Sequence, residues 1–141
     1  MKALTLTQPW ATLIAIGAKK IETCSWSTSY RGPLAIHAAR GGYNDDIVIA
    51  DTPFRRALEK AGIQSRLQIP LGCVVAICEL VRIDSIKEGY WKYITQDERD
   101  FGDYTAGRYA WILENVSELS HPISAKGALG LWEWNGNLDT K

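Results

Sequence analysis

The sequence predicts an α+β fold, a small mixed β-barrel with short helices on its outside. Five or six short segments have strand-like apolar patterns, two or three repeat apolar residues at helical spacing, and glycines occupy most corners between them. A doubly wound parallel sheet fits less well, because full-length helices do not separate the strands from Cys73 onward. The 141 residues are 46% hydrophobic and 23% charged, which predicts one globular domain, 1–141.

The first forty residues predict three strands and one helix. Alternating apolar residues predict a strand that stops before Pro9. Residues 10–16 repeat apolar side chains on one helical face, and Gly17 suits the left-handed position after a helix. Residues 19–26 and 34–38 are predicted as the next two strands.

The remainder predicts two more helix starts and three more strands. Thr52-Pro53 begins a helix that Gly62 ends, and residues 95–98 have capping-box spacing. The run from Cys73 to Ile83 is apolar on both faces until Glu79, so it is predicted as the central strand, with Glu79 near the core. The last two predicted strands are 109–116 and 130–134.

Charge and cysteine content narrow the classes of function. Sixteen Lys+Arg balance sixteen Asp+Glu, so we expect no binding to long duplex DNA, although a local basic patch can serve a short RNA. The three cysteines match no metal or redox spacing and are expected to be reduced. No segment resembles a signal peptide or membrane span, which predicts a cytoplasmic protein without a membrane partner.

The segment 17–24 is the strongest functional signal from the residues alone. Lys19, Lys20 and Glu22 follow a helix-ending glycine, and Trp10 and Trp26 flank them, an arrangement suited to holding a base or another small polar ligand. A structural salt bridge at a pocket lip is the alternative. Two residues three apart on a strand point to opposite faces, so Lys19 and Glu22 share a cleft only if Lys19 lies in a loop.

Several segments together resemble the ASCH family, the activating-signal-cointegrator homology domains of the PUA-like barrels. The motif Gly17-x-Lys19-x-x-Glu22 matches the family signature, except that Cys24 stands where the family usually has arginine. Further matching segments are Gln8-Pro9-Trp10-Ala11, Arg31 to Ala38, Glu98 to Tyr104, Gly107 to Trp111 and Gly130 to Trp134. The resemblance covers nearly the whole chain and implies a PUA-like barrel.

The resemblance implies three functions. The first is binding of RNA or a modified nucleoside or nucleotide in a Lys/Glu/aromatic cleft. The second is deacetylation of N(4)-acetylcytidine, with Lys19 as oxyanion partner, Glu22 as base in place of the threonine of related amidohydrolases, and Glu98 or Glu79 as the distant carboxylate. The third is ribonuclease activity. Because glutamate cannot replace a threonine nucleophile, binding is favoured over hydrolysis.

Candidate ligand-binding residues are cations and aromatic side chains near these motifs: Lys20, Trp26, Arg31, Arg40, Tyr104, Arg108, Tyr109 and Trp111. The structural alternative for Trp111, Trp132 and Trp134 is a place in the core, and it is favoured for the last two. His37 is predicted to be structural. No cofactor is predicted, and the acidic residues 97–103 are explained by a helix start better than by a metal site.

Overall fold

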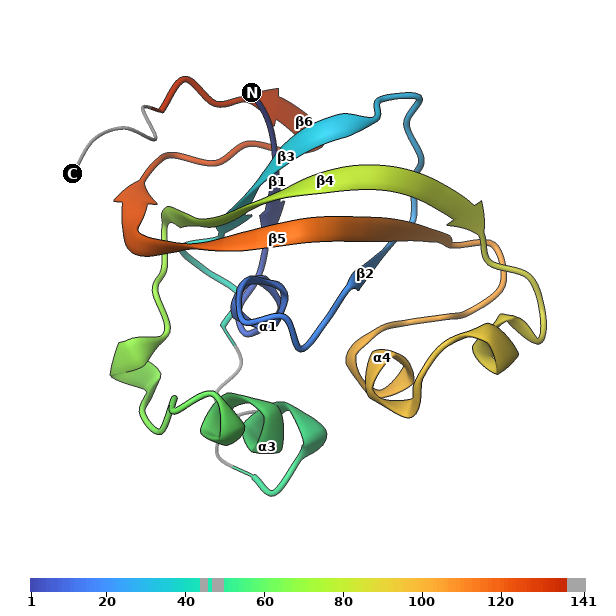
Figure 1. Ribbon diagram of the computed structural model, residues 1–141, viewed down its shortest axis with the longest axis horizontal. Coiled ribbons are helices and arrows are strands. Elements are labelled where there is room, and N and C mark those ends of the chain that lie inside the picture. Colours follow the sequence, from blue (N-terminus) through green and yellow to red (C-terminus); the bar gives the residue numbers. More distant parts are fainter. Residues whose placement is uncertain (44–45, 47–49, 137–141) are drawn as a thin grey trace.

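A curled, mixed six-stranded sheet forms the framework of the computed structural model, which describes residues 1–43, 46 and 50–136 (Figure 1). Its strands are β1 (Lys2–Leu6), β2 (Ile21–Cys24), β3 (Gly32–Ala38), β4 (Cys73–Ser85), β5 (Tyr109–Ser124) and β6 (Leu131–Glu133). The order is β2-β5-β4-β3-β1-β6, with β1 parallel to β3 and the other neighbours antiparallel. The sheet is a half-barrel and confirms the predicted α+β class.

Among the described residues, three short helices lie on the same side of β4 and β5: α1 (Trp10–Ala15), α3 (Pro53–Lys60) and α4 (Gln96–Phe101) (Figure 1). Two 3-10 turns, η1 (Arg66–Gln68) and η2 (Tyr90–Tyr93), lie in the connections. The Thr52 hydroxyl accepts the amide of Arg55 at 3.2 Å, and Gly17 has φ +82 just after α1. Both helix-boundary predictions are therefore confirmed.

The core lies between the inner face of the sheet and α1. Every residue from Ala11 to Ala15 is buried, because α1 sits within the curl of the sheet. Trp111 of β5 is 0% exposed and is the largest side chain in this cluster. A second apolar cluster, with Leu13, Leu58 and Phe101 buried in it, joins α1 to α3 and α4. Trp134 is also buried, as the sequence predicted.

The strand β5 continues well beyond its predicted end at residue 116. Its outer half is exposed and polar and contains Pro122, so the sequence lacks a strand pattern there. The outer half pairs only with the start of β4, because β2 ends its pairing at Ile112. A register shift between the pairs Val74–Ile123 and Ala76–Glu118 leaves 119–122 outside the ladder, where a proline removes no ladder hydrogen bond.

The predicted position of Glu79 near the core is wrong. Glu79 is exposed, whereas its neighbours Cys78 and Leu80 are 2% and 1% exposed. Residues 73–76 of β4 are buried on both faces, but from Glu79 onward only one face is covered, so the strand alternates there. Glu79 therefore does not reach the interior.

Candidate functional site

Lys19 is completely buried at the junction between α1 and β2. The amides of Ala18 and Lys19 both donate to the carbonyl of Leu13, at 3.0 Å each, so Lys19 still belongs to the turn that ends the helix. It precedes β2, and strand alternation does not apply to it. Its Nζ donates to Glu22 Oε1 at 2.8 Å and to the carbonyl of Ile21. The two charged groups are therefore paired.

Glu22 lines a cleft at the mouth of the half-barrel. Its side chain is 13% exposed, and in the β2–β5 ladder it lies opposite Trp111. The cleft has a volume of about 410 Å³ and is called here the Glu22 cleft. Its walls come from the end of β1, from α1, α3 and β2, and from the end of α4 and the segment after it. They are formed by Leu6, Thr7, Trp10, Glu22, Thr23, Phe54, 100–103 and Arg108.

Two aromatic rings and one guanidinium give this cleft its chemical character. Trp10 meets Phe54 edge-on, with ring centroids 5.5 Å apart, and Trp10 Nε1 donates to the carbonyl of Phe101 at 2.8 Å. Arg108 Nη2 donates to the carbonyl of Thr23 at 3.2 Å, and Arg108 Nε lies 3.5 Å from Asp103 Oδ2. The cleft thus combines apolar rings with a fixed acceptor and a fixed donor.

Glu98 does not line the Glu22 cleft. Its Oε2 accepts the amide of Lys20 at 2.7 Å and its Oε1 accepts the amide of Ile21 at 3.3 Å, so α4 is tied to the start of β2. Glu98 and Lys20 line a different cavity of about 590 Å³, called the Glu98 hollow, which also contains Tyr90 and Tyr93. Of the three residues predicted as catalytic, Glu22 and Glu98 therefore line different cavities, and the buried Lys19 lines neither of them.

Burial raises the pKa of Glu98, and this effect exceeds the opposing effects of the Lys20 amide and the Lys19 charge. A carboxyl with a raised pKa in the folded state binds more protons there than in the unfolded chain. Its contribution to stability is therefore greatest at low pH and falls as the pH rises. The ordinary glutamate pKa of 4.5 marks the lower edge of this window.

We expect the wild-type free energy of unfolding to decrease, relative to that of Glu98→Gln, as the pH rises above 4.5. Urea unfolding at several pH values measures this difference, and the other carboxylates are common to both proteins. A difference that is flat or grows with pH would contradict the raised pKa.

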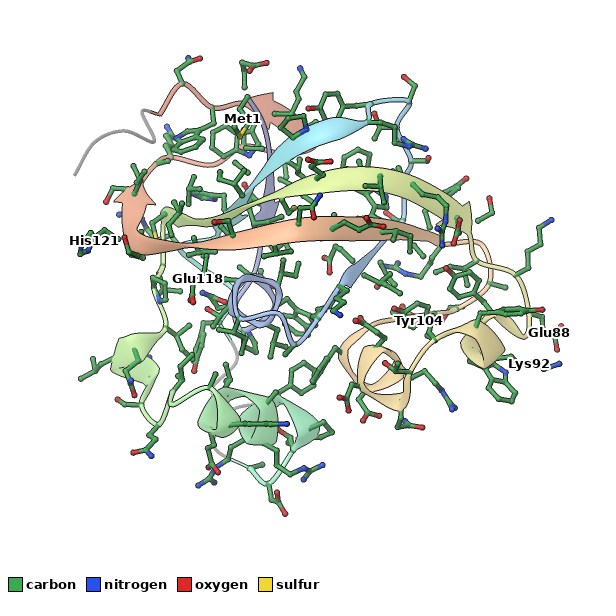
Figure 2. The ribbon with its side chains drawn as sticks, in the orientation of Figure 1. Met1, Glu88, Lys92, Tyr104, Glu118 and His121 are labelled. Carbon is green, nitrogen blue, oxygen red and sulfur yellow. The ribbon has the colours of Figure 1, made fainter. Side chains whose placement is uncertain are left out.

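The remaining predicted ligand residues are dispersed. Trp26 packs edge-on against Trp111 at 4.8 Å, and Trp111 Nε1 donates to the Trp26 carbonyl at 3.2 Å, so these rings and Tyr109 pack at the core. Tyr104 lies between α4 and the sheet, stacked on Tyr90 at 5.9 Å (Figure 2). Of the predicted binding residues, Arg108 lines the Glu22 cleft.

Two predicted cations lie elsewhere. Arg31 is exposed and donates to the carbonyls of Thr28 and Tyr30 in the loop before β3. Arg40 lines a third cavity together with Lys126. Neither guanidinium lines the Glu22 cleft.

Cys24 stands where the family that this chain resembles usually has arginine. Its side chain is 8% exposed and lies beside the cleft. Burial, reinforced by the charge of Glu22, raises the pKa of its thiol to about 12. The thiol is therefore protonated at neutral pH and supplies neither a positive charge nor a nucleophile.

Sequence reasoning missed Phe54, Thr23 and Asp103 as cleft residues. Phe54 showed only the apolar spacing of a helix face, and the contact with Trp10 that turns it toward the cleft joins segments over forty residues apart. The Thr23 hydroxyl accepts the Asp103 amide at 3.1 Å, a long-range contact that has no local pattern. Within the described residues, no three His, Cys, Asp or Glu side chains are grouped to hold a metal ion.

The comparisons with known proteins agree with this architecture. The family model described as the ASCH domain matches residues 4–123, which include the end of β1, all of β2 to β4, nearly all of β5 and the whole Glu22 cleft. The chain belongs to the ASCH domain family. The resemblance found in the sequence motifs is thereby confirmed, and the paired Lys19 and Glu22 lie within the matched region of this ASCH domain.

Two relatives are similar over almost the whole chain. Activating signal cointegrator 1 of mouse and that of human are each 27% identical over 138 residues, 98% of this chain. This chain spans only 22% of the length of each relative. Among the described residues, no helix has the length and apolar character needed to cross a membrane.

Proposed function

We propose that this ASCH domain binds the base of a nucleotide or of a short single-stranded RNA in the Glu22 cleft. The observation that carries the proposal is the position of the Glu22 carboxylate, which is held at the wall of an aromatic cleft by the buried Lys19 ammonium at 2.8 Å. A volume of about 410 Å³ lies within the range of small-ligand sites.

The charges of the cleft favour the base over the phosphate. Glu22, Asp100 and Asp103 line it, and Arg108 is the cation among its described lining residues. An excess of carboxylates repels a phosphate but can accept the N–H groups of a base edge, whereas the rings of Trp10 and Phe54 offer apolar contact to its faces.

Deacetylation of N(4)-acetylcytidine has less support in this arrangement. The Lys19 ammonium is directed to Glu22 and to the carbonyl of Ile21, and both Glu98 oxygens accept backbone amides outside the cleft. Incubation of the protein with N(4)-acetylcytidine, followed by chromatography for cytidine, tests this alternative. Turnover that Lys19→Ala abolishes would favour it.

Phe54→Ala is expected to weaken nucleoside binding by about 1–3 kcal/mol, because a base in the cleft loses an aromatic contact of that size. Isothermal titration with each of the four ribonucleosides measures the loss. Tyr93→Ala is the matched control, since Tyr93 is 82% exposed and lines the Glu98 hollow. Equal losses in both variants, or no binding to the wild-type protein, would reject the proposal.

A further inference from the structure

A second cavity, the Arg40 groove, differs from the others in its charge. Its volume is about 890 Å³, and it is lined by Thr5, His37, Ala39, Arg40, Gly72 and 124–129. Its charged lining residues are Arg40 and Lys126, with no carboxylate among the described residues. Three other cavities of the described chain, including the Glu22 cleft and the Glu98 hollow, contain carboxylates. Of these four cavities, the Arg40 groove is therefore the one whose charges most favour an anion.

Both cations are exposed and make no ion pair within the described residues. The Arg40 side chain lies against the backbone of Gly72, where an added Cβ would be 3.2 Å from Arg40 Nε. Gly72 also has φ +67, a conformation that favours glycine. The guanidinium is thus set beside a bare stretch of backbone, with its donors available to a ligand.

The floor of the groove is closely packed and hydrogen-bonded. Trp132 Nε1 donates to Thr5 Oγ1 at 2.9 Å, and the Thr5 hydroxyl lies 3.2 Å from His37 Nδ1. His37 Nε2 lies 2.7 Å from the Ala125 carbonyl, which can only accept, so Nε2 donates this hydrogen bond. A Cβ on Gly127 would lie 2.7 Å from both Thr5 Oγ1 and His37 Cε1. The two cationic side chains therefore lie at the rim of the groove.

The groove and the Glu22 cleft lie on opposite sides of the end of β1, because the neighbouring side chains of Thr5 and Leu6 point to opposite faces of the strand. Thr5 lines the groove, and Leu6 and Thr7 line the cleft. Thr5 and Thr7 are about 7 Å apart along the chain, so an RNA strand of a few nucleotides that passes around the end of β1 can reach both cavities. Segment 39–42 passes between them, since a Cβ on Gly42 would touch Thr7 Cγ2 at 2.7 Å.

Building on the proposed function, we propose that the Arg40 groove binds the phosphodiester backbone of a single-stranded RNA whose base occupies the Glu22 cleft. The acidic cleft takes the base, and Arg40 and Lys126 take phosphates of neighbouring nucleotides. The preferred ligand is then an oligonucleotide and not a free nucleoside, and the two cations supply affinity without base specificity.

The test compares two double variants with matched charge. Arg40→Ala/Lys126→Ala removes the groove cations, and Lys87→Ala/Lys92→Ala removes two exposed cations beyond the other end of β4. Lys92 and His121 lie at opposite ends of the molecule in Figure 2, and His121 marks the end of β5 that is near the groove. Anisotropy of a fluorescein-labelled, mixed-sequence RNA of about twelve nucleotides, between about 50 and 200 mM salt, gives the affinity and its salt dependence.

We expect Arg40→Ala/Lys126→Ala to bind this RNA about tenfold more weakly and to lower the salt slope by about 1.4, because two phosphate contacts are lost. Titrations with the four nucleosides should be unchanged, and the Lys87/Lys92 control should resemble wild type. Equal loss in both double variants, or loss of nucleoside binding in the groove variant, would overturn the proposal.

Two further outcomes distinguish this proposal from the proposal that the Glu22 cleft binds a base. If nucleosides bind as tightly as the RNA, the proposed role of the groove is wrong and the proposed role of the cleft stands. If neither nucleosides nor RNA bind, both proposals are wrong. A polyglutamate peptide of equal charge serves as competitor. If it displaces the labelled RNA as well as unlabelled RNA does, the groove recognises acidic side chains and the assignment to phosphodiesters is wrong.

Discussion

Trp111→Ala is expected to lower the free energy of unfolding by about 3–5 kcal/mol, the usual cost of removing a large buried aromatic side chain. The ring is 0% exposed, packs edge-on against Trp26, and lies opposite Glu22 in the ladder between β2 and β5. Its loss opens a cavity directly beneath the wall of the Glu22 cleft. Urea unfolding followed by far-ultraviolet circular dichroism measures the change without depending on tryptophan fluorescence.

Trp91→Ala provides the control, because Trp91 is 50% exposed on η2 and contacts the charged groups of Lys92 and Arg99. Its expected cost is below about 1 kcal/mol. Trp111→Phe should fall between the two, since it keeps most of the ring but leaves the Trp26 carbonyl without the indole donor. Similar costs for Trp111→Ala and Trp91→Ala would mean that Trp111 is not a core residue.

Local patterns in the sequence were sufficient to predict most of the framework. The alternation in β1 and β3, the apolar run of β4 and the Thr52-Pro53 helix start each depend on residues close together in the chain. The same holds for Thr95, whose hydroxyl accepts the amide of Glu98 at 3.2 Å. The structure therefore has these elements at the positions that their local patterns predicted.

The predictions from sequence were less accurate where contacts between segments far apart in the chain determine the structure. The spacing of Thr95 and Glu98 is that of a capping box, yet the Glu98 carboxylate turns away from its own helix to accept amides of residues 20 and 21. The outer half of β5 has no apolar alternation, because neither of its faces is buried and residues 117–124 are exposed or half-buried. A single sequence does not contain these contacts.

In the candidate site, too, local patterns were predictive and long-range contacts were not. The sequence identified Lys19, Glu22 and Arg108, which lie close along the chain to a glycine turn or a strand start. Phe54 reaches the cleft because α3 packs against α1 and α4. Trp111 was predicted to contact ligand, but it occupies the core, because its ring packs against Trp26 and the core cluster on the inner face of the sheet.

Glu22→Gln is expected to destabilise the fold by about 3 kcal/mol, because it leaves the buried Lys19 ammonium without its ion-pair partner. The two partners are not equivalent: the Lys19 side chain is 0% exposed, whereas that of Glu22 is 13% exposed. Lys19→Met should cost less, since the remaining carboxylate borders the cleft and retains some contact with water. Urea unfolding of both variants tests this order, and a larger cost for Lys19→Met would contradict it.

The double variant Lys19→Met/Glu22→Gln separates stability from binding. Removing both charges eliminates the uncompensated ammonium, so its stability should exceed that of Glu22→Gln alone, and the double-mutant cycle gives the coupling between the two residues. Nucleoside affinity should not recover, because the carboxylate that accepts the N–H groups of the base is absent. A double variant that regains both stability and affinity would show that the pair serves only the fold, and the base would then have to be recognised by Arg108 and the aromatic walls alone.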